Sequence, residues 1–487
     1  MRLASPLAVA VALALSGCAS LTARHEPLPG VAVPAQWTAT PATDNATALA
    51  GWWQRFNDPQ LSQLVTQALQ ANTTVRSAQA ALAQARALRD VQSAQLGPTL
   101  GASASAQRNK VGDAPAGNSY HAGFDASWEP DLFGGKQAAL SASEADARAS
   151  QATLASTQVS IAAEVAVAYM QLRGAQARLA LARSNLASQQ ETLQITEWRV
   201  QAGLATSLDL AQSRTATEQT SALIPTLQTS IAQTQHALAV LTGQAPTALQ
   251  AKVEAAVPVP LPADDLVLSI PAQTLRQRPD VRAAEQQVAA ALARVSQADA
   301  ARYPSFNLSG SVGLSAIALS SLTSGASLVS GLLGSVSVPL FDGGAARAQV
   351  RSQEAGLEQA RVAYQAVVLN ALQEVEDSLA ALRGDRERLQ RLRNASDSAE
   401  QAALLATNRY SSGLVDFQTV LDTQRSLLAT QDAVASTQAE LSADHVRLYK
   451  ALGGGWEGGH PGEGRDPLAT PTSLSPVDPG MRRGDDT

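Results

Sequence analysis

The sequence predicts a mixed α/β fold that is mostly helical, with four β-strands and two long helical hairpins. Three observations favour this fold. Four segments of about ten residues alternate apolar with small polar residues, as strands with two unlike faces do. Two long stretches, 136–224 and 340–460, contain no proline, which favours uninterrupted helices. Matching phrases recur 206 to 211 residues apart, so the chain is a duplication of one long unit.

The 487-residue chain has few bulky side chains, since aromatic residues make up 4% of it and charged residues 16%. Such a composition cannot fill several compact cores, and we expect long elements joined through seams of small residues. The formal net charge is −6. Because no segment is strongly basic with interleaved aromatic residues, we expect no nucleic-acid partner.

The first 18 residues, "MRLASPLAVAVALALSGC", have the charge, the apolar run and the small-residue end of a secretory signal peptide. The chain has one cysteine, Cys18, so no intrachain disulfide is possible. The stretch "LSGC" resembles the bacterial lipobox. That resemblance implies a lipoprotein signal at 1–17 and a mature N-terminus at Cys18 that carries a diacylglycerol thioether and an amide-linked acyl chain such as palmitate. The alternative is an ordinary cleaved signal with an incidental cysteine.

The duplication shows as ordered landmarks with a slowly drifting offset. The offset is 206 between "TVR" and "DVR", 208 between the two Leu-Phe pairs, and 210 between "RVQAGL" and "RYSSGL". Such drift indicates small loop insertions between equivalent units. We expect an extended segment at 18–50, a first repeat at 51–245, a linker at 246–270, a second repeat at 271–452 and a disordered tail, rich in Gly and Pro, at 453–487.

We expect strands at about 98–107, 119–130, 304–316 and 327–340. The clearest, "SYHAGFDASWE", places Tyr, Ala, Phe, Ala and Trp on one face and polar residues with one Gly on the other. Each strand is long enough to cross a bilayer obliquely, although a soluble sheet with one buried face would show the same pattern. The mature chain has no segment apolar enough for a spanning helix, so a membrane crossing would use the strands. Open sheet edges are not tolerated in lipid, and we therefore expect an oligomer that shares one sheet.

We expect helical hairpins at 136–242 and 344–451. Apolar and small residues in both follow the four-three spacing of a left-handed supercoil. The first helix would be roughly 100 Å long, given the rise of about 1.5 Å per residue. A junction phrase, "EPDLFGG" or "VPLFDGG", precedes each hairpin. Its glycine pair permits a sharp change from strand to helix, and we expect its Leu-Phe pair to be buried.

The hairpins reverse at "QAGLATSLDLAQ" and "SSGLVDFQTVLDTQ", far from the strands. Gly203 and Gly413 suit the left-handed residue that ends a helix. Ser207 or Asp416 would cap the helix that follows. The chain is therefore expected to have a membrane end and a distal end.

These elements in order, a lipobox, a strand pair, a Leu-Phe-Gly junction, a long hairpin with a Gly-Leu tip and then the repeat, resemble the TolC-type outer-membrane efflux family. The resemblance is to its OprM/NodT-like lipoprotein branch, covers roughly 52–452, and is most specific in "RYSSGLVDFQTVLDTQRSLL". It implies a homotrimeric membrane channel, anchored by lipid in the outer membrane of a Gram-negative bacterium. Twelve transmembrane strands would form one β-barrel and the coiled-coil helices a periplasmic α-barrel, with the linker in an equatorial belt.

The resemblance further implies an exit duct for drugs or other small molecules, which pass through it passively. Its partners would be outer-membrane lipid, a periplasmic adaptor (a membrane fusion protein) and an inner-membrane pump of the resistance-nodulation-division (RND) type. Two alternatives are a channel for type I protein secretion and a lipid-anchored coiled-coil scaffold that does not conduct. The sequence does not reveal the cargo, the particular pump and adaptor, or the resting state.

The resemblance also assigns roles at the two tips. The residues expected to contact the adaptor are Gly203, Leu204, Ala205, Gly413, Leu414 and Val415. Those expected at the periplasmic aperture are Asp416, Asp422, Asp209, Arg409 and Tyr410. Converging carboxylates there would favour cations, and the Arg-Tyr pair would hold a closed tip through hydrogen bonds. The alternative for each aspartate is a helix cap or a solvated face.

The sequence carries no signal for catalysis. The five histidines have no metal-ligand spacing, and there is no phosphate-binding loop, no GxSxG motif and no cysteine besides Cys18. We therefore expect no enzyme activity, no cofactor and no metal site.

Overall fold

The computed structural model describes residues 51–110, 112–113, 115–262, 275 and 277–455. Its helices are η2 (Trp52–Phe56), α2 (Pro59–Ala71), α3 (Thr73–Ala94), α4 (Gly135–Gln201), α5 (Ser207–Leu241), α6 (Gln250–Val253), α7 (Pro279–Ala300), α8 (Ala345–Ser411) and α9 (Phe417–Ala451). Its strands are β1 (Thr99–Asn109), β2 (Gly117–Trp128), β3 (Ser305–Ala316) and β4 (Leu328–Ser337), with the short helices η5 (Leu319–Ser321) and η6 (Gly325–Ser327) between the last two. The predicted signal, Cys18, the segment at 18–50 and the predicted tail from 456 on lie outside the described residues.

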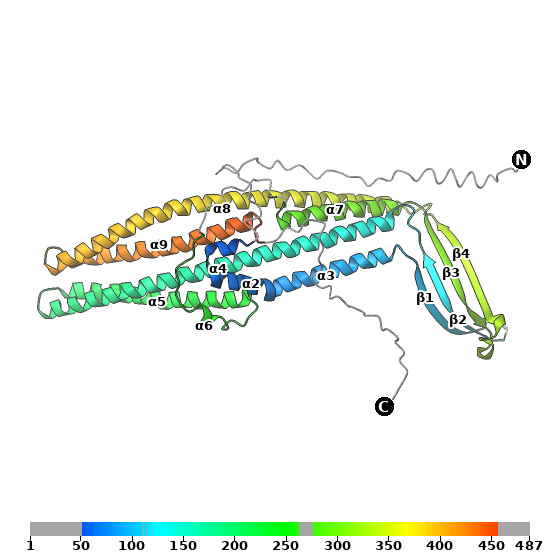
Figure 1. Ribbon diagram of the computed structural model, residues 1–487, viewed down its shortest axis with the longest axis horizontal. Helices are drawn as coiled ribbons and strands as arrows, with labels where there is room; N and C mark the ends of the chain where they lie inside the picture. Colours follow the sequence, from blue (N-terminus) through cyan, green and yellow to red (C-terminus); the bar gives the residue numbers. More distant parts are fainter. Residues whose placement is uncertain (1–50, 111, 114, 263–274, 276, 456–487) are drawn as a thin grey trace, which may run out of the picture. The chain divides into compact units, whose positions relative to one another are not determined.

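The helices of the two repeats have equal lengths. Helices α3 and α7 have 22 residues each, α4 and α8 have 67, and α5 and α9 have 35. Helices α4 and α8 each run from the strands to a hairpin tip, with a shorter helix beside each half of their length (Figure 1). The sequence prediction did not include α2, α3 and α7, which lie outside the two long proline-free stretches. None of the described helices is both long and apolar enough to span a membrane.

The four strands form one antiparallel sheet in the order β1-β2-β3-β4. Strand β2 ends at Trp128 and β4 at Ser337, before the predicted ends at 130 and 340. Pro130 and Pro339 lie just beyond these ends, where the missing backbone N–H stops the ladder. In the described part of the chain, β1 and β4 each pair on one side and form the two edges of the sheet.

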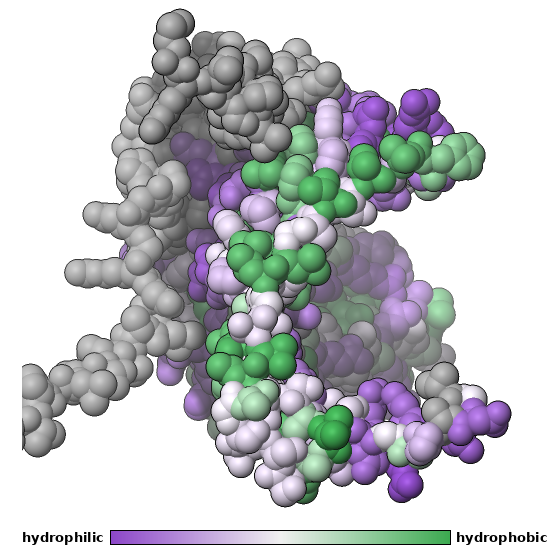
Figure 2. Space-filling model, turned by 90° about the vertical axis from the view of Figure 1, so that its right-hand side faces the viewer, coloured by the Kyte–Doolittle hydropathy of each residue, from purple (hydrophilic) through white to green (hydrophobic). Residues whose placement is uncertain are grey.

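The sheet has one largely apolar and one largely polar face, although Val329 and Leu333 of β4 lie on the polar face. Cross-strand partners share a face, and Phe124 pairs with Ala102 on one side and with Val312 on the other. Asp125, one residue later, pairs with Gly101 and Ser311 on the opposite face. Hydrophobic patches separated by paler, small residues cover the strand end in Figure 2. The period-two pattern in the sequence thus corresponds to two chemically distinct faces.

The junction glycines adopt the left-handed conformation that the sharp turn requires. Gly134 has φ 76° and Gly344 has φ 88°, and each directly precedes a 67-residue helix. The expected burial of the Leu-Phe pairs is wrong for Leu132, which is 54% exposed, and for Leu340 and Phe341, which are each 93% exposed, whereas Phe133 is half-buried. Phe133 stacks on Tyr303 of the second repeat at 5.0 Å, whereas Phe341 stacks on no ring among the described residues.

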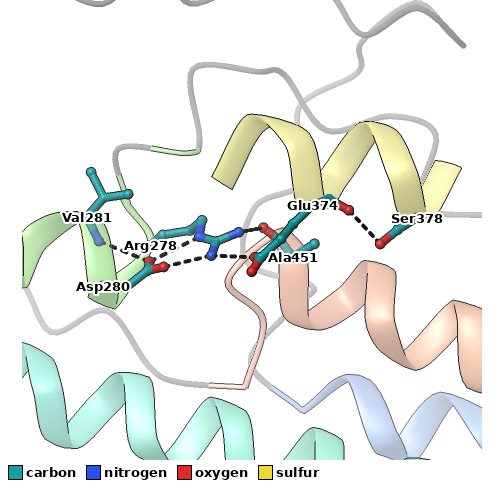
Figure 3. Close-up of polar contacts among 6 residues, drawn as sticks. All are labelled: Arg278, Asp280, Val281, Glu374, Ser378 and Ala451. Carbon is teal, nitrogen blue, oxygen red and sulfur yellow. Dashed lines mark hydrogen bonds and ion pairs between the residues drawn. The ribbon is translucent and has the colours of Figure 1, made fainter. Parts of the chain in front are cut away.

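Helices α7, α8 and α9 meet at the buried Arg278 (Figure 3). Its guanidinium donates to the carbonyl of Ala451 at 2.6 Å and pairs with Glu374 at 2.8 Å and Asp280 at 2.7 Å. Burial lowers the pKa of Arg278, but the two carboxylates outweigh this and raise it, so the cation stays charged. In the first repeat the equivalent Asn72 donates to Leu241 O at 2.8 Å.

We predict that Gly123→Ala destabilises the sheet. Gly123 pairs with Gly313, and a Cβ at Gly123 would lie 2.8 Å from the carbonyl oxygen of Val312. Such overpacking costs about 1–3 kcal/mol and should lower the midpoint of thermal unfolding. The matched control is Gly334→Ala in β4, where nothing lies within 4 Å of the added Cβ. Equal midpoints for the two variants would contradict this account of the paired glycines.

Candidate functional site at the hairpin tips

The two hairpins reverse through equivalent turns. Gly203 has φ 77° and Gly413 has φ 74°, as expected of residues that end α4 and α8. Leu204 N donates to Arg199 O at 2.7 Å, and Leu414 N donates to Arg409 O at 2.9 Å. The backbone turn leaves Leu204 76% and Leu414 75% exposed. Each tip therefore presents an apolar side chain to solvent, beside the half-buried Ala205 or Val415.

Thr206, rather than the predicted Ser207, caps α5. Its hydroxyl accepts from Asp209 N at 3.1 Å, while the Asp209 carboxylate accepts from Thr206 N at 2.8 Å. This reciprocal capping box satisfies two backbone donors that the helix start would leave unpaired. Asp209 thus has the local capping role that sequence analysis gave as the alternative. Its place at an aperture remains a prediction.

Asp416 caps α9, as the sequence predicted. Its Oδ1 accepts from the backbone N of Thr419 at 2.9 Å and from the hydroxyl of the same residue. The Thr419 hydroxyl bond, helped by the backbone bond, lowers the pKa of the exposed Asp416 carboxyl below its usual value. Asp422 lies farther along α9, where it accepts from Gln418 at 2.9 Å and pairs with Arg425 at 3.8 Å. Both carboxylates are exposed on the described chain.

Arg199, which sequence analysis missed, joins the two tips. Its guanidinium lies over the Tyr410 ring at 4.4 Å and donates to the carbonyls of Tyr410 at 3.3 Å and Ser411 at 3.1 Å. Arg409, the equivalent residue of the second repeat, forms no ion pair or side-chain hydrogen bond with the described residues. Val200 stands where the second repeat has Tyr410, so the first tip offers no ring for a cation to cover.

A small apolar cluster supports this contact. Phe417 and Leu421 of α9 are buried with Ala216 of α5, and Tyr410 packs against them with its ring 5.4 Å from that of Phe417. Phe417 directly follows the Asp416 cap, a position from which an apolar side chain can turn into the hairpin. Trp198, which is 59% exposed, adds apolar surface near the first tip. Across the described ranges no group of three or more His, Cys, Asp or Glu residues could hold a metal ion.

Comparison with known proteins identifies the family. The sequence matches the family described as "Outer membrane efflux protein" over residues 64–244 and 270–454, which is most of the chain. The chain belongs to the outer membrane efflux protein family. This agrees with the resemblance of the tip motif, and the members of the family are channel proteins rather than enzymes.

Relatives and solved structures agree with this assignment. The toluene efflux pump outer membrane protein TtgF of Pseudomonas putida is 31% identical over 470 residues, which cover 93% of this chain and 97% of the relative. The probable outer membrane lipoprotein SilC of Salmonella typhimurium is 30% identical and covers 92% of this chain and 98% of its own length. The outer-membrane channel OprN superposes with a TM-score of 0.81 at 36% identity, covering 88% of this efflux protein and 99% of OprN. VceC of Vibrio cholerae superposes with a TM-score of 0.78 at 28% identity, covering 84% and 99%.

This efflux protein therefore has the fold of the TolC-like outer-membrane channels and serves as the outer-membrane component of an efflux system. The relatives do not favour type I secretion or a scaffold that does not conduct.

We predict that Arg199→Ala loosens the second tip. The variant loses the ring contact and two hydrogen bonds, which together contribute about 1–2 kcal/mol, so amide exchange at 409–421 should become roughly 5- to 30-fold faster. Hydrogen exchange with mass spectrometry measures this. Arg409→Ala is the matched control from the other repeat and should leave the exchange rates unchanged. A similar acceleration in both variants would show that Arg199 does not hold the tips together.

Proposed function

We propose that three copies of this chain form the outer-membrane exit duct of a tripartite efflux system, through which small molecules pass passively. The observation that carries the proposal is that the two repeats have three pairs of equally long helices but unequal contacts. Helix α4 packs on α3, α5, α7 and α9, whereas the equivalent α8 packs mainly on α7 and α9. One flank of α8 thus lacks the neighbours that the same flank of α4 has.

Two equivalent glycines show the difference in packing between α4 and α8. A Cβ at Gly174 of α4 would lie 2.5 Å from the Cβ of Ala439, because α9 packs closely there. At Gly384, the equivalent glycine of α8, nothing lies within 4 Å. Since the sequence keeps a small residue at both places, we infer that α8 packs as closely on α5 of a second copy as α4 packs on α9.

The same reasoning applies to the sheet. Strand β2 of the first repeat pairs with β3 of the second, so β4 is expected to pair with β1 of the next copy. Such head-to-tail contacts close into a ring. A closed ring removes the open edges that lipid does not tolerate. Three copies, the number in the TolC-type channels that the sequence resembles, supply twelve strands.

The tips support the choice of partners. They lie at the opposite end of α4 and α8 from the strands (Figure 1), which would place them in the periplasm. The exposed Leu204 and Leu414 are suited to contact an adaptor that leads from an inner-membrane pump, which we propose is of the RND type. Asp416 and Asp422 would line the aperture between the copies. The names of relatives, which refer to toluene efflux and to pyoverdine export, support small molecules as cargo.

A lipid on Cys18 would anchor the duct. Two or more acyl chains give stable attachment, with each buried methylene contributing about 0.8 kcal/mol. The lipobox-like "LSGC" supports the anchor, as does the relative SilC, which is named a lipoprotein.

Paired cysteines test the ring. A Cβ at Gly135 would lie 3.2 Å from the Cβ of Ala300, so Gly135→Cys with Ala300→Cys should form a disulfide within one chain. The equivalent pair across the proposed boundary is Ala345→Cys with Ala94→Cys. Both alanines are exposed on the single chain. We expect this pair to give covalent dimers and trimers on non-reducing gels.

The two cysteine pairs are each other's control, with Cys18 replaced by Ser in a parallel set. The pair within one chain, Gly135→Cys with Ala300→Cys, should form its disulfide without a dimer or trimer band on the gel. Closure of that pair, combined with monomers alone for Ala345→Cys with Ala94→Cys, would contradict the ring.

We predict that Leu204→Ser with Leu414→Ser impairs efflux while the protein level is unchanged. Removing two exposed leucines from a contact surface should weaken adaptor binding about tenfold or more. Accumulation of a fluorescent efflux dye in the native host measures the loss. Leu404→Ser is the control, because Leu404 is also exposed, at 63%, but lies on the side of α8 rather than at its tip. Unimpaired efflux in the double variant would remove the two leucines from the adaptor contact.

A further inference from the structure

The polar face of the sheet carries one carboxylate, which lies among mostly small side chains. Along the row of cross-strand partners the residues are Gly101, Asp125, Ser311 and Gly331. Two glycines and a serine leave Asp125 as the longest side chain of its row. Ser103, on the same face, donates its hydroxyl hydrogen to Asp125 Oδ2 at 2.8 Å.

This carboxylate is exposed rather than packed. Asp125 borders a hollow of about 630 Å³ against the sheet, which Ser309, Ser311 and Leu333 also line. Within the four described strands the polar face has one other titratable residue, His121, which pairs with Ser105 and Ser315. The strand residue Arg108 lies on the opposite face, beside its partner Asn118. The polar face thus has no cationic partner for Asp125 within the strands.

We propose that Asp125 sets the charge selectivity of the strand-lined part of the duct, where it favours cationic and disfavours anionic cargo. This inference rests on the proposed function, because it needs the sheets of several copies to close into one barrel. The apolar face, with Phe124 and Val312, then meets lipid and the polar face lines the lumen.

Ring closure multiplies the charge. Three copies place three Asp125 carboxylates at one level of the lumen, in a wall of mostly serine and glycine that also includes Val329 and Leu333 of β4. Rings of carboxylates favour cations in channels. The serine and glycine neighbours are too short to cover the carboxylates, so a passing solute meets them directly.

Labelling of a thiol beside Asp125 tests the charge selectivity of the strand-lined part separately from any effect of the hairpin tips. Ser311→Cys places a thiol on the strand paired with Asp125, and the protein is studied in lipid nanodiscs, where reagents enter from the sheet end. Rates are measured by mass spectrometry for a cationic and an anionic methanethiosulfonate reagent. With Asp125 present, the ratio of cationic to anionic rate should be about three- to tenfold higher than with Asp125→Asn. Any effect of the carboxylate on thiol ionisation cancels in the ratio, and Asp125→Glu should restore it.

A second thiol separates the inference from the proposed function. Val312→Cys lies on the apolar face and should react slowly with both reagents, because lipid covers it. Equal reactivity at 311 and 312 would contradict the barrel itself. Fast labelling at 311, protection at 312 and an unchanged ratio in Asp125→Asn would leave the barrel intact and overturn the role of Asp125. Labelling of unsubstituted protein, which has Cys18 alone, gives the background.

Discussion

The unpaired backbone of β1 and β4 is the constraint on which the rest of the structure depends. A four-stranded sheet has two rows of N–H and C=O groups without strand partners, and each such group costs several kcal/mol in hydrocarbon. The chain cannot relieve this cost alone, since both edges belong to exposed strands at opposite sides of the sheet. The proposed association through these edges would satisfy the groups and would also cover the exposed flank of α8.

The duplicated unit occurs in two settings. The first repeat lies beside the second repeat, whereas the second repeat has a flank without a neighbour in the described chain. The first repeat finds its neighbour in the second repeat, so Phe133 stacks on Tyr303 and Gly174 packs against Ala439. The second repeat keeps matching residues at Phe341 and Gly384 without such a neighbour in its own chain. Away from the buried cluster that includes Trp52, Tyr169 and Tyr449, small residues supply many of the buried positions along the long helices. This agrees with the many buried alanines and the low aromatic content.

Periodicity and turn chemistry were predictable from the sequence, and contacts between repeats were not. The strands were predictable because their residues alternate between apolar and polar side chains, which is typical of strands. The left-handed turns at Gly203 and Gly413 were predictable because glycine tolerates that conformation. Helices α3 and α7 were missed since they lie outside the two long proline-free stretches from which the hairpins were predicted. Arg199 was missed because its partner Tyr410 is 211 residues away, and no local pattern shows that the other repeat supplies the ring.

The tips differ from the middle of the duct in how little holds them together. Near the middle, Arg278 joins three helices through a buried cation with two carboxylates and a carbonyl, and breaking these contacts would leave the buried guanidinium unpaired. At the tips the hairpins share the contacts of Arg199 with Tyr410 and Ser411 and the apolar cluster of Ala216, Phe417 and Leu421. Regions with few buried contacts open at low free energy. A motion confined to the tips therefore breaks few interactions, while the strands and the Arg278 junction keep the wall closed.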